Sequence, residues 1–183
     1  MNYILLFGSL NVGKQNRIKM SDLKAFLVDM GLTHLQTFLQ SGNVLANSPL
    51  STDELRQLIN KEFAEKFGFY SLVIVIPADN FQRIPAELPF TQAEIQNAQT
   101  YEPTIKHLYV YFFESELSAE QLATVTINGK DRISYQKDLQ VLYVLSYDSV
   151  RTSPTIRALG KLKLPMTARN WNTVEKLVTA SNC

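Results

Sequence analysis

The sequence predicts an α+β fold made of two ferredoxin-like halves of βαββαβ type, each with an antiparallel sheet backed by helices. Three observations support this prediction. Apolar runs and amphipathic segments follow one another over residues 1–77 as strand, helix, strand, strand, helix, strand. The same order begins again after residue 103. Each amphipathic segment has only one apolar face, as expected of a helix that covers one side of a sheet.

The repeated order of elements divides the chain into three parts. Residues 1–77 form the first ferredoxin-like unit, residues 78–103 a connector with short helices, and residues 104–183 the second unit plus C-terminal helices. Prolines within the connector favour loops over long elements. The second unit shows no obvious last strand, so we expect the C-terminal tail to replace or extend it.

The first elements are a strand, a loop and a helix in direct succession. Residues 3–7 form an apolar run that is too short for a helix and is ended by Gly8, which predicts a buried strand. Ser21 is the expected N-cap of the helix that follows the loop. The apolar stripe of this helix consists of Leu23, Phe26, Leu27 and Met30. Gly31 stands where a left-handed residue commonly ends a helix.

The rest of the first half predicts a hairpin, a second helix and a strand. The hairpin consists of strands at residues 34–40 and 44–46 with a tight turn at residues 41–43. Ser51 and Glu54 have the spacing of a capping box at the start of a helix that ends at Gly68. The apolar run at residues 71–76 is rich in Val and Ile and predicts a central strand, ended by Pro77.

The second half predicts an aromatic strand, a helix, a hairpin and two further helices. Their residue ranges are 107–113, 118–126, 132–136 with 140–146, 154–159 and 171–180. Ser118 and Gln121 have capping-box spacing, and Asn128-Gly129 supplies a turn before the hairpin. Two short helices, near residues 79–83 and 92–99, are expected in the connector.

Composition and charge are those of an ordinary globular protein. The chain has 183 residues, of which 45% are hydrophobic and 19% charged, and its formal net charge is +1. This balance gives no general field for nucleic acid or membranes, so anion binding requires a local cluster of cations. One acid-free stretch, residues 149–174, contains Arg151, Arg157, Lys161, Lys163 and Arg169. A solvated surface is the favoured explanation of that stretch.

The cysteine content and the apolar runs bear on where the protein is found. The single cysteine is the last residue, Cys183, so the sequence contains no internal disulfide and no CxxC motif. No signal-peptide pattern opens the sequence, and no apolar run approaches the ~18 residues of a membrane span. We therefore expect a soluble, cytoplasmic protein without a membrane partner.

Familiar catalytic motifs are incomplete in this chain. Residues 8–14 fit the phosphate-binding pattern GxxxxGK and follow a strand, as that pattern requires. Gln15 replaces the Ser or Thr that holds magnesium, and the later apolar strand ends in Pro77 instead of an acidic ligand, so we expect no magnesium-dependent nucleotide hydrolysis. His34 and His107 lack metal-ligand spacing, and no GxSxG elbow occurs. The sequence predicts neither a metal nor a cofactor.

Amide and guanidinium side chains are concentrated in three predicted loops. The first contains Asn11, Gly13, Asn16 and Arg17, the second Ser41, Gly42 and Asn43, and the third Arg169, Asn170 and Asn172. The first loop has no acidic residue from Gly8 to Lys19, so we expect its partner to be anionic or hydrogen-bonding. Turn geometry and helix capping explain asparagine equally well, and both explanations stay open.

Three blocks that contain these loops resemble the signature stretches of an uncharacterised bacterial family, known only as a domain of unknown function. The blocks are Asn11-Val12-Gly13-x-x-Asn16-x-x-x-Met20, Leu39-Gln40-Ser41-Gly42-Asn43-Val44 and Thr167-x-Arg169-Asn170-Trp171-Asn172-Thr173-Val174. The resemblance covers nearly the whole chain and implies no activity, because the family has none assigned. The family typically opens with Arg-Gly-Ile-Asn-Val-Gly-Gly, where this chain has Gly8, Ser9 and Lys14 in place of the arginine and two of the glycines.

The sequence therefore predicts a binding protein for a small anionic or phosphate-bearing ligand, held where the three polar loops converge. An enzyme of unknown reaction that uses the same cleft is the first alternative. A single-stranded nucleic-acid binder is the second, although the aromatic strand at residues 107–113 lacks the glycines of base-stacking sheet motifs. The sequence does not specify the ligand, a protein partner or the oligomeric state.

Overall fold

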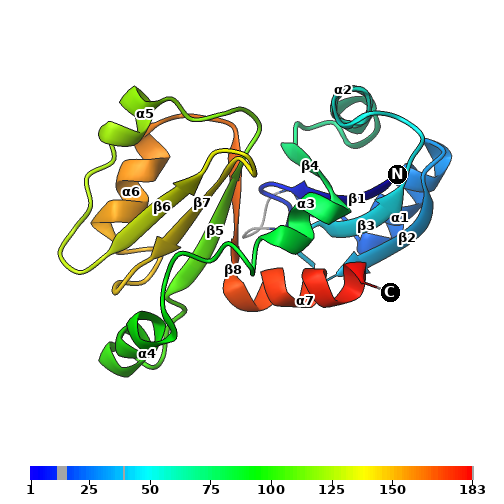
Figure 1. The fold of residues 1–183 in the computed structure, drawn as a ribbon. Coiled ribbons are helices and arrows are strands. Elements are labelled where there is room, and N and C mark those ends of the chain that lie inside the picture. The colour runs from blue at the N-terminus through cyan, green and yellow to red at the C-terminus, as the bar shows by residue number, and fades with distance from the viewer. Residues whose placement is uncertain (12–15, 39, 183) are drawn as a thin grey trace. The chain divides into compact units, whose positions relative to one another are not determined.

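The chain folds into two compact units in a computed structural model, which describes residues 1–11, 16–38 and 40–182 (Figure 1). Unit 1 consists of Met1–Arg83 together with Leu177–Cys183, and unit 2 of Ile84–Lys176. Each unit contains a four-stranded antiparallel sheet, and the predicted α+β class is confirmed. The described residues contain no helix that is both long and apolar enough to cross a lipid bilayer.

The sheet of unit 1 has the strand order β2-β3-β1-β4, and neighbouring strands are antiparallel. Its strands are β1 (Asn2–Phe7), β2 (Thr33–Phe38), β3 (Asn43–Asn47) and β4 (Val73–Pro77). The helices are α1 (Met20–Asp29) after β1, α2 (Thr52–Phe67) after β3 and the short α3 (Ala78–Arg83) after β4. In chain order, the elements from β1 to β4 follow the predicted βαββαβ pattern, and α3 comes after them.

One face of this sheet carries the core of unit 1. Tyr3, Leu5 and Phe7 alternate with residues of the opposite face along β1, as the two-residue period of a strand requires. They pack against apolar residues of α1 and α2, which include Leu23, Leu27, Leu55, Ile59 and Phe63. Burying each such side chain contributes about 1.5–3 kcal/mol, so this face holds both helices on the sheet.

Local signals set both ends of α2 as the sequence predicts. The Ser51 hydroxyl accepts a hydrogen bond from the Glu54 backbone N–H at 3.4 Å, and the Glu54 carboxylate accepts from the Ser51 backbone N–H at 2.9 Å. Hydrogen bonds from the Ser51 side chain and backbone lower the pKa of Glu54. Gly68 ends the helix at a φ of 73°, in the left-handed region.

Two sequence predictions for unit 1 are wrong. Ser21 does not cap α1, because the helix begins at Met20 with Lys19 in the N-cap position, and the Ser21 hydroxyl donates to the Asp22 carboxylate instead. The strand at residues 71–76 is not central, because β4 lies at the edge of the sheet beside β1. Its apolar residues are explained by burial on both faces, because Val73 and Val75 lie in the core with α1 and α2 and Ile74 and Ile76 are buried on the opposite face.

The sheet of unit 2 repeats the arrangement in the order β6-β7-β5-β8, with antiparallel neighbours. Its strands are β5 (Leu108–Phe113), β6 (Arg132–Gln136), β7 (Val141–Leu145) and β8 (Met166–Asn170). The expectation that this half lacks a last strand is wrong, because β8 pairs with β5 along its whole length. The segment is short and contains Arg169 and Asn170, so its strand character depends on that pairing more than on its own apolar content.

The helices of unit 2 are α4 (Gln92–Tyr101), α5 (Ala119–Ala123) and α6 (Pro154–Lys161), and α7 (Trp171–Ser181) begins in unit 2 and ends in unit 1. Residues of α5 and α6 pack against one face of the sheet. Leu159 of α6 is buried among Tyr111 and Phe113 of β5. The predicted capping box at Ser118 and Gln121 is present at the start of α5.

Candidate functional site

The C-terminal end of β1 is the point where three segments of unit 1 meet. The Phe7 N–H donates to the Gly42 carbonyl at 2.8 Å, which joins β1 to the turn of the β2-β3 hairpin. The Gly8 N–H donates to the Leu72 carbonyl at 2.7 Å, and the Ser71 hydroxyl donates to the Gly8 carbonyl at 2.8 Å. The loop after β1 therefore begins beside the hairpin turn and the start of β4.

Asn11 ties this loop to the hairpin turn. Its side-chain nitrogen donates to the carbonyl oxygens of Ile18 at 3.0 Å and Gln40 at 2.8 Å. Its side-chain oxygen accepts from the Ile18 N–H at 2.9 Å, and its backbone N–H donates to the Asn16 carbonyl at 3.1 Å. Asn11 thus joins Asn16 and Ile18 of its own loop to Gln40 of the hairpin turn. We call residues 8–11, 16–19 and 40–43 the joined loops.

The backbone of the joined loops is strained. Ser9, Asn11 and Asn16 have φ angles of 58°, 55° and 53°, in the left-handed region that non-glycine residues rarely adopt. They are three of the six non-glycine residues with positive φ in the part of the chain that the structure describes. Each costs about 1–2 kcal/mol, and such strain collects at functional sites. Its concentration here makes these loops the leading candidate site.

The hairpin turn at residues 41–43 is shaped by packing and by its own hydrogen bonds. Asn43 is fully buried, and its side-chain nitrogen donates to the Phe38 carbonyl at 3.1 Å and to the Ser41 hydroxyl at 2.9 Å. Gly42 has a φ of 71°, and a Cβ at this position would lie 2.7 Å from the Phe7 Cβ. Gly42 and Asn43 therefore build the turn, whereas Ser41 is exposed.

Positive charge lies on the outside of the joined loops. Arg17 and Lys19 are exposed, and the sequence from Gly8 to Lys19 contains no acidic residue. Lys19 also directly precedes α1, whose first N–H groups form the positive end of the helix dipole. Asp22 lies in the first turn of the same helix, so the positive charge is local to Arg17 and Lys19. The predicted site residue Gly13, like Lys14 of the GxxxxGK pattern, lies outside the described residues.

The third predicted segment is not a loop. Arg169 and Asn170 end β8, and Asn172 is exposed in the first turn of α7. The Asn170 side-chain oxygen accepts from the Thr173 N–H at 3.1 Å and lies 3.2 Å from the Thr173 hydroxyl, which donates to it. Asn170 therefore serves as a helix cap. This segment belongs to unit 2, and its convergence with the joined loops stays a prediction.

Arg169 is a buried cation. Only 8% of the residue is exposed, and its Nη1 atom donates to the Thr167 hydroxyl and to the Ala168 carbonyl, both at 2.8 Å. Burial lowers its pKa to about 10, so the side chain stays charged at neutral pH. In each sheet the last strand pairs with the first. Arg169 of β8 pairs with β5 at the position equivalent to that where Ile76 of β4, which is buried, pairs with β1. A charge at a buried apolar position costs free energy, which makes Arg169 a candidate functional residue.

The aromatic strand of the nucleic-acid alternative contributes to the core of unit 2. Tyr111 and Phe113 are buried in a cluster with Leu142 and Leu159, and Tyr109 packs against the same cluster. Burial, with a smaller contribution from Tyr109, raises the pKa of Tyr111 to about 12. These rings serve packing, so they give the nucleic-acid alternative no support.

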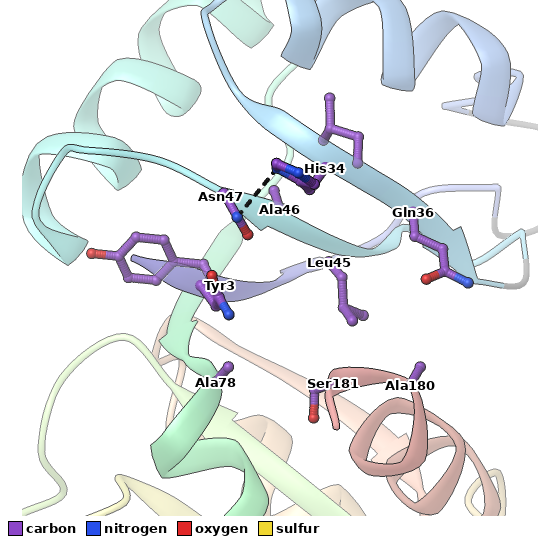
Figure 2. Close-up of a pocket in the computed structure, with 11 residues that line it drawn as sticks. Tyr3, His34, Gln36, Leu45, Ala46, Asn47, Ala78, Ala180 and Ser181 are labelled. Atoms are coloured by element: carbon purple, nitrogen blue, oxygen red, sulfur yellow. Dashed lines mark hydrogen bonds between the residues drawn. The ribbon is translucent and has the colours of Figure 1, made fainter. Parts of the chain in front are cut away.

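Sequence reasoning missed a cavity of about 510 Å³ in unit 1 (Figure 2). The amide side chains of Asn2, Gln36 and Asn47 line it together with His34 and Leu45. These polar residues stand on the face of the sheet opposite the α1 and α2 core. The signal in the sequence is weak, because each amide is an ordinary strand residue and only strand pairing brings the three together.

Comparison with known proteins agrees with the fold and assigns no activity. A family model described as "Protein of unknown function (DUF1697)" matches residues 1–143. The structure of the conserved bacterial protein SP0830 from Streptococcus pneumoniae is similar, with a TM-score of 0.72 and 21% sequence identity over 98% of this chain and 98% of that chain. At this identity the likeness shows the fold alone. None of the curated proteins matches the chain.

Proposed function

The chain belongs to the family of proteins of unknown function designated DUF1697, and we propose that it binds a small anionic ligand at the joined loops. The ligand presents carboxylate or phosphate oxygens, which backbone N–H groups and guanidinium groups recognise. One observation carries the proposal. The hydrogen bonds of Asn11 to Ile18 and Gln40 fix a strained, cationic and acid-free loop against the hairpin turn.

A loop that is ordered before the ligand arrives binds at lower cost. Each side chain that binding must immobilise costs about 0.5–1.5 kcal/mol. Four hydrogen bonds of Asn11 already join it to Asn16, Ile18 and Gln40. Residues in sparsely populated backbone conformations cluster at ligand sites, so the left-handed φ angles of Ser9, Asn11 and Asn16 support a role beyond chain connection.

Arg17 is the proposed charged contact. Its exposed guanidinium can donate to two oxygens of one carboxylate or phosphate, and a charge-assisted bond of this kind is worth about 1.5–3 kcal/mol. Ser41 adds a hydroxyl from the neighbouring turn, and Lys19 adds a second positive charge. Asn16 completes the proposed contacts of unit 1. The residues that hold these contacts in place are Asn11, Gly42 and Asn43.

Within unit 2, we propose that Arg169 and Asn172, at the end of β8 and the start of α7, contact an anion as well. The support is energetic, because a buried guanidinium replaces the isoleucine of the repeated position and a function that uses its charge would explain that cost. Arg169→Met keeps an unbranched apolar stem without the charge. Unchanged anion binding by a folded Arg169→Met protein would contradict this role of Arg169.

Ligand-induced stabilisation of the full chain tests the proposal. Inorganic phosphate, citrate and uncharged glucose are added separately while the midpoint of thermal unfolding is measured. A ligand at 100 times its Kd stabilises by about 2.7 kcal/mol, so at least one anion should raise the midpoint in a saturable manner and glucose should not. Phosphate tests the binding of phosphate oxygens, and citrate tests the binding of carboxylate oxygens.

Two matched variants separate a site from a general salt effect. Arg17→Gln should abolish the rise, whereas Lys61→Gln removes an exposed charge from α2 and should retain it. Excluded anions stabilise any folded protein without a binding site. An equal rise in the unmodified protein and in both variants would therefore contradict the proposal.

A further inference from the structure

We infer that unit 1 has a second binding site, the cavity on the face of its sheet opposite α1 and α2, and that it takes an uncharged planar heterocycle such as a nucleobase. The cavity volume of about 510 Å³ lies within the range of small-molecule sites. Asn2 and Tyr3 line it at the start of β1, whereas the joined loops follow the end of that strand. The two sites are therefore separate.

Strand pairing arranges the polar side chains around an apolar floor. Leu45 pairs with Gln36 of β2, and Asn47, two residues further along β3, pairs with Asn2 of β1. Residues two apart on a strand share a face, and directly paired Cβ atoms lie about 4.5–5.5 Å apart. The three amides therefore surround Leu45 within reach of a single small molecule.

Small side chains form the opposite wall of the cavity. Figure 2 shows Ala78 from α3 with Ala180 and Ser181 from the end of α7, facing Leu45 across the space. The Gln82 side-chain nitrogen donates to the Ser181 carbonyl at 3.1 Å, which attaches the end of α7 to α3. The space is thus bounded by a sheet on one side and short side chains on the other. Such a slot suits a flat molecule.

His34 contributes a strained rim to the slot. Its φ is 51°, at the point where the pairing of β2 with β3 shifts register between Thr33 and Gln36. The Asn47 side-chain nitrogen lies 3.3 Å from the His34 Nδ1 atom, the contact drawn in Figure 2. The imidazole of His34 therefore adds polar ring nitrogens to the groups around the space.

The lining selects an uncharged ligand with adjacent donors and acceptors. The described residues that line the cavity include neither Asp or Glu nor Lys or Arg. Asn2 and Gln36 each carry an acceptor and two donors, the combination with which Asn and Gln bind the edge of adenine, and Asn47 adds its amide oxygen. Leu45 offers an apolar surface for the face of a ring. A nucleobase has a polar edge that the amides can bind and an apolar ring face that can pack on Leu45.

Calorimetric titration of the full chain with adenosine, guanosine, cytidine and uridine tests the inference. These nucleosides carry no phosphate, so their binding is independent of the anion site proposed above. We expect saturable binding of at least one of them. Gln36→Leu should weaken that binding about tenfold, the loss expected for one two-bond amide contact. Gln57→Leu makes the same change on the exposed side of α2 and should leave binding unchanged.

A second variant closes the slot. Ala180→Leu should abolish nucleoside binding, whereas Ala180→Ser should retain it, and circular dichroism confirms that both fold. If Ala180→Leu fails to fold, the exposed Gln36→Leu variant decides the question alone. No saturable binding of any of the four nucleosides overturns the inference. Binding that is equally strong in Gln36→Leu and Gln57→Leu overturns it as well, because the ligand then lies elsewhere.

Discussion

The side-chain nitrogen of Asn11 lies 2.8 Å from the carbonyl oxygen of Gln40, 29 residues further along the chain. This hydrogen bond connects the loop after β1 to the turn of the next hairpin. The same side chain also accepts a hydrogen bond from the backbone N–H of Ile18 and donates one to its carbonyl oxygen. The geometry of the proposed anion site therefore depends on one asparagine.

Replacing Asn11 separates its hydrogen bonds from its strained backbone. Asn11→Gly removes the side-chain bonds but accepts the φ of 55°, whereas Asn11→Ala removes the same bonds and keeps the left-handed strain. We expect both variants to be less stable than the unmodified protein, and the alanine variant to be worse by about 1 kcal/mol in urea unfolding. Equal stability of the two variants would show that the backbone at this position is relaxed.

Gly42→Ala should destabilise unit 1 more than Gly31→Ala. Both glycines have positive φ, 71° and 85°, so alanine costs about 1–2 kcal/mol at either position. At Gly42 the new Cβ would also lie 2.7 Å from the Phe7 Cβ, whereas at Gly31 no described atom lies within 4 Å of it. Overpacking adds about 1–3 kcal/mol. Denaturant unfolding that ranks Gly31→Ala as the less stable variant would refute this close contact.

Asp131 anchors the start of α6 in unit 2. It is buried, its Oδ1 atom accepts from the Tyr147 N–H at 2.7 Å, and its Oδ2 atom lies 3.2 and 3.3 Å from the hydroxyls of Ser146 and Ser153. Asp131→Ala removes the acceptor of these three hydrogen bonds and should cost about 3 kcal/mol of unfolding free energy.

The exposed Asp138 is the matched control for this prediction. Asp138→Ala should change the unfolding free energy by less than about 0.5 kcal/mol, as is usual for surface substitutions. Comparable losses in Asp131→Ala and Asp138→Ala, measured by urea unfolding, would mean that the buried network adds nothing beyond surface charge.

Thr167→Val tests the environment of Arg169. The substitution conserves shape but removes the hydroxyl that accepts from Nη1 at 2.8 Å, and we expect a loss of about 1.5–3 kcal/mol. In an Arg169→Met background the same substitution should cost much less, because the charged donor is gone. Denaturant unfolding of the two single variants and the double variant measures this coupling, and additive losses would contradict the direct bond.

Much of the fold follows from short-range signals in the sequence. Ser51 with Glu54 and Ser118 with Gln121 form the predicted capping boxes, because both partners of each pair lie within one helical turn. β8 could not be predicted in this way. Its five residues include Arg169 and Asn170, and they form a strand through pairing with β5, more than fifty residues earlier in the chain.

The candidate site was predictable in composition but not in geometry. The sequence singled out Asn11, Ser41 and Asn43 because amides and hydroxyls gather there without acids. It could not show that Asn43 is buried and shapes the turn while Asn11 bonds Gln40, since these roles depend on contacts between strands. The cavity at Gln36 and Asn47 was missed for the same reason, because single amides on strands carry no pattern of their own.

The most direct test of anion binding at the joined loops is an NMR titration of the full chain with inorganic phosphate and, separately, with citrate. Backbone amide signals report the position of the ligand residue by residue. We predict saturable shifts of at least one titration that are largest at Asn16, Arg17, Ser41 and Gly42. Shifts that never saturate, or saturable shifts confined to residues outside the joined loops, would contradict the account.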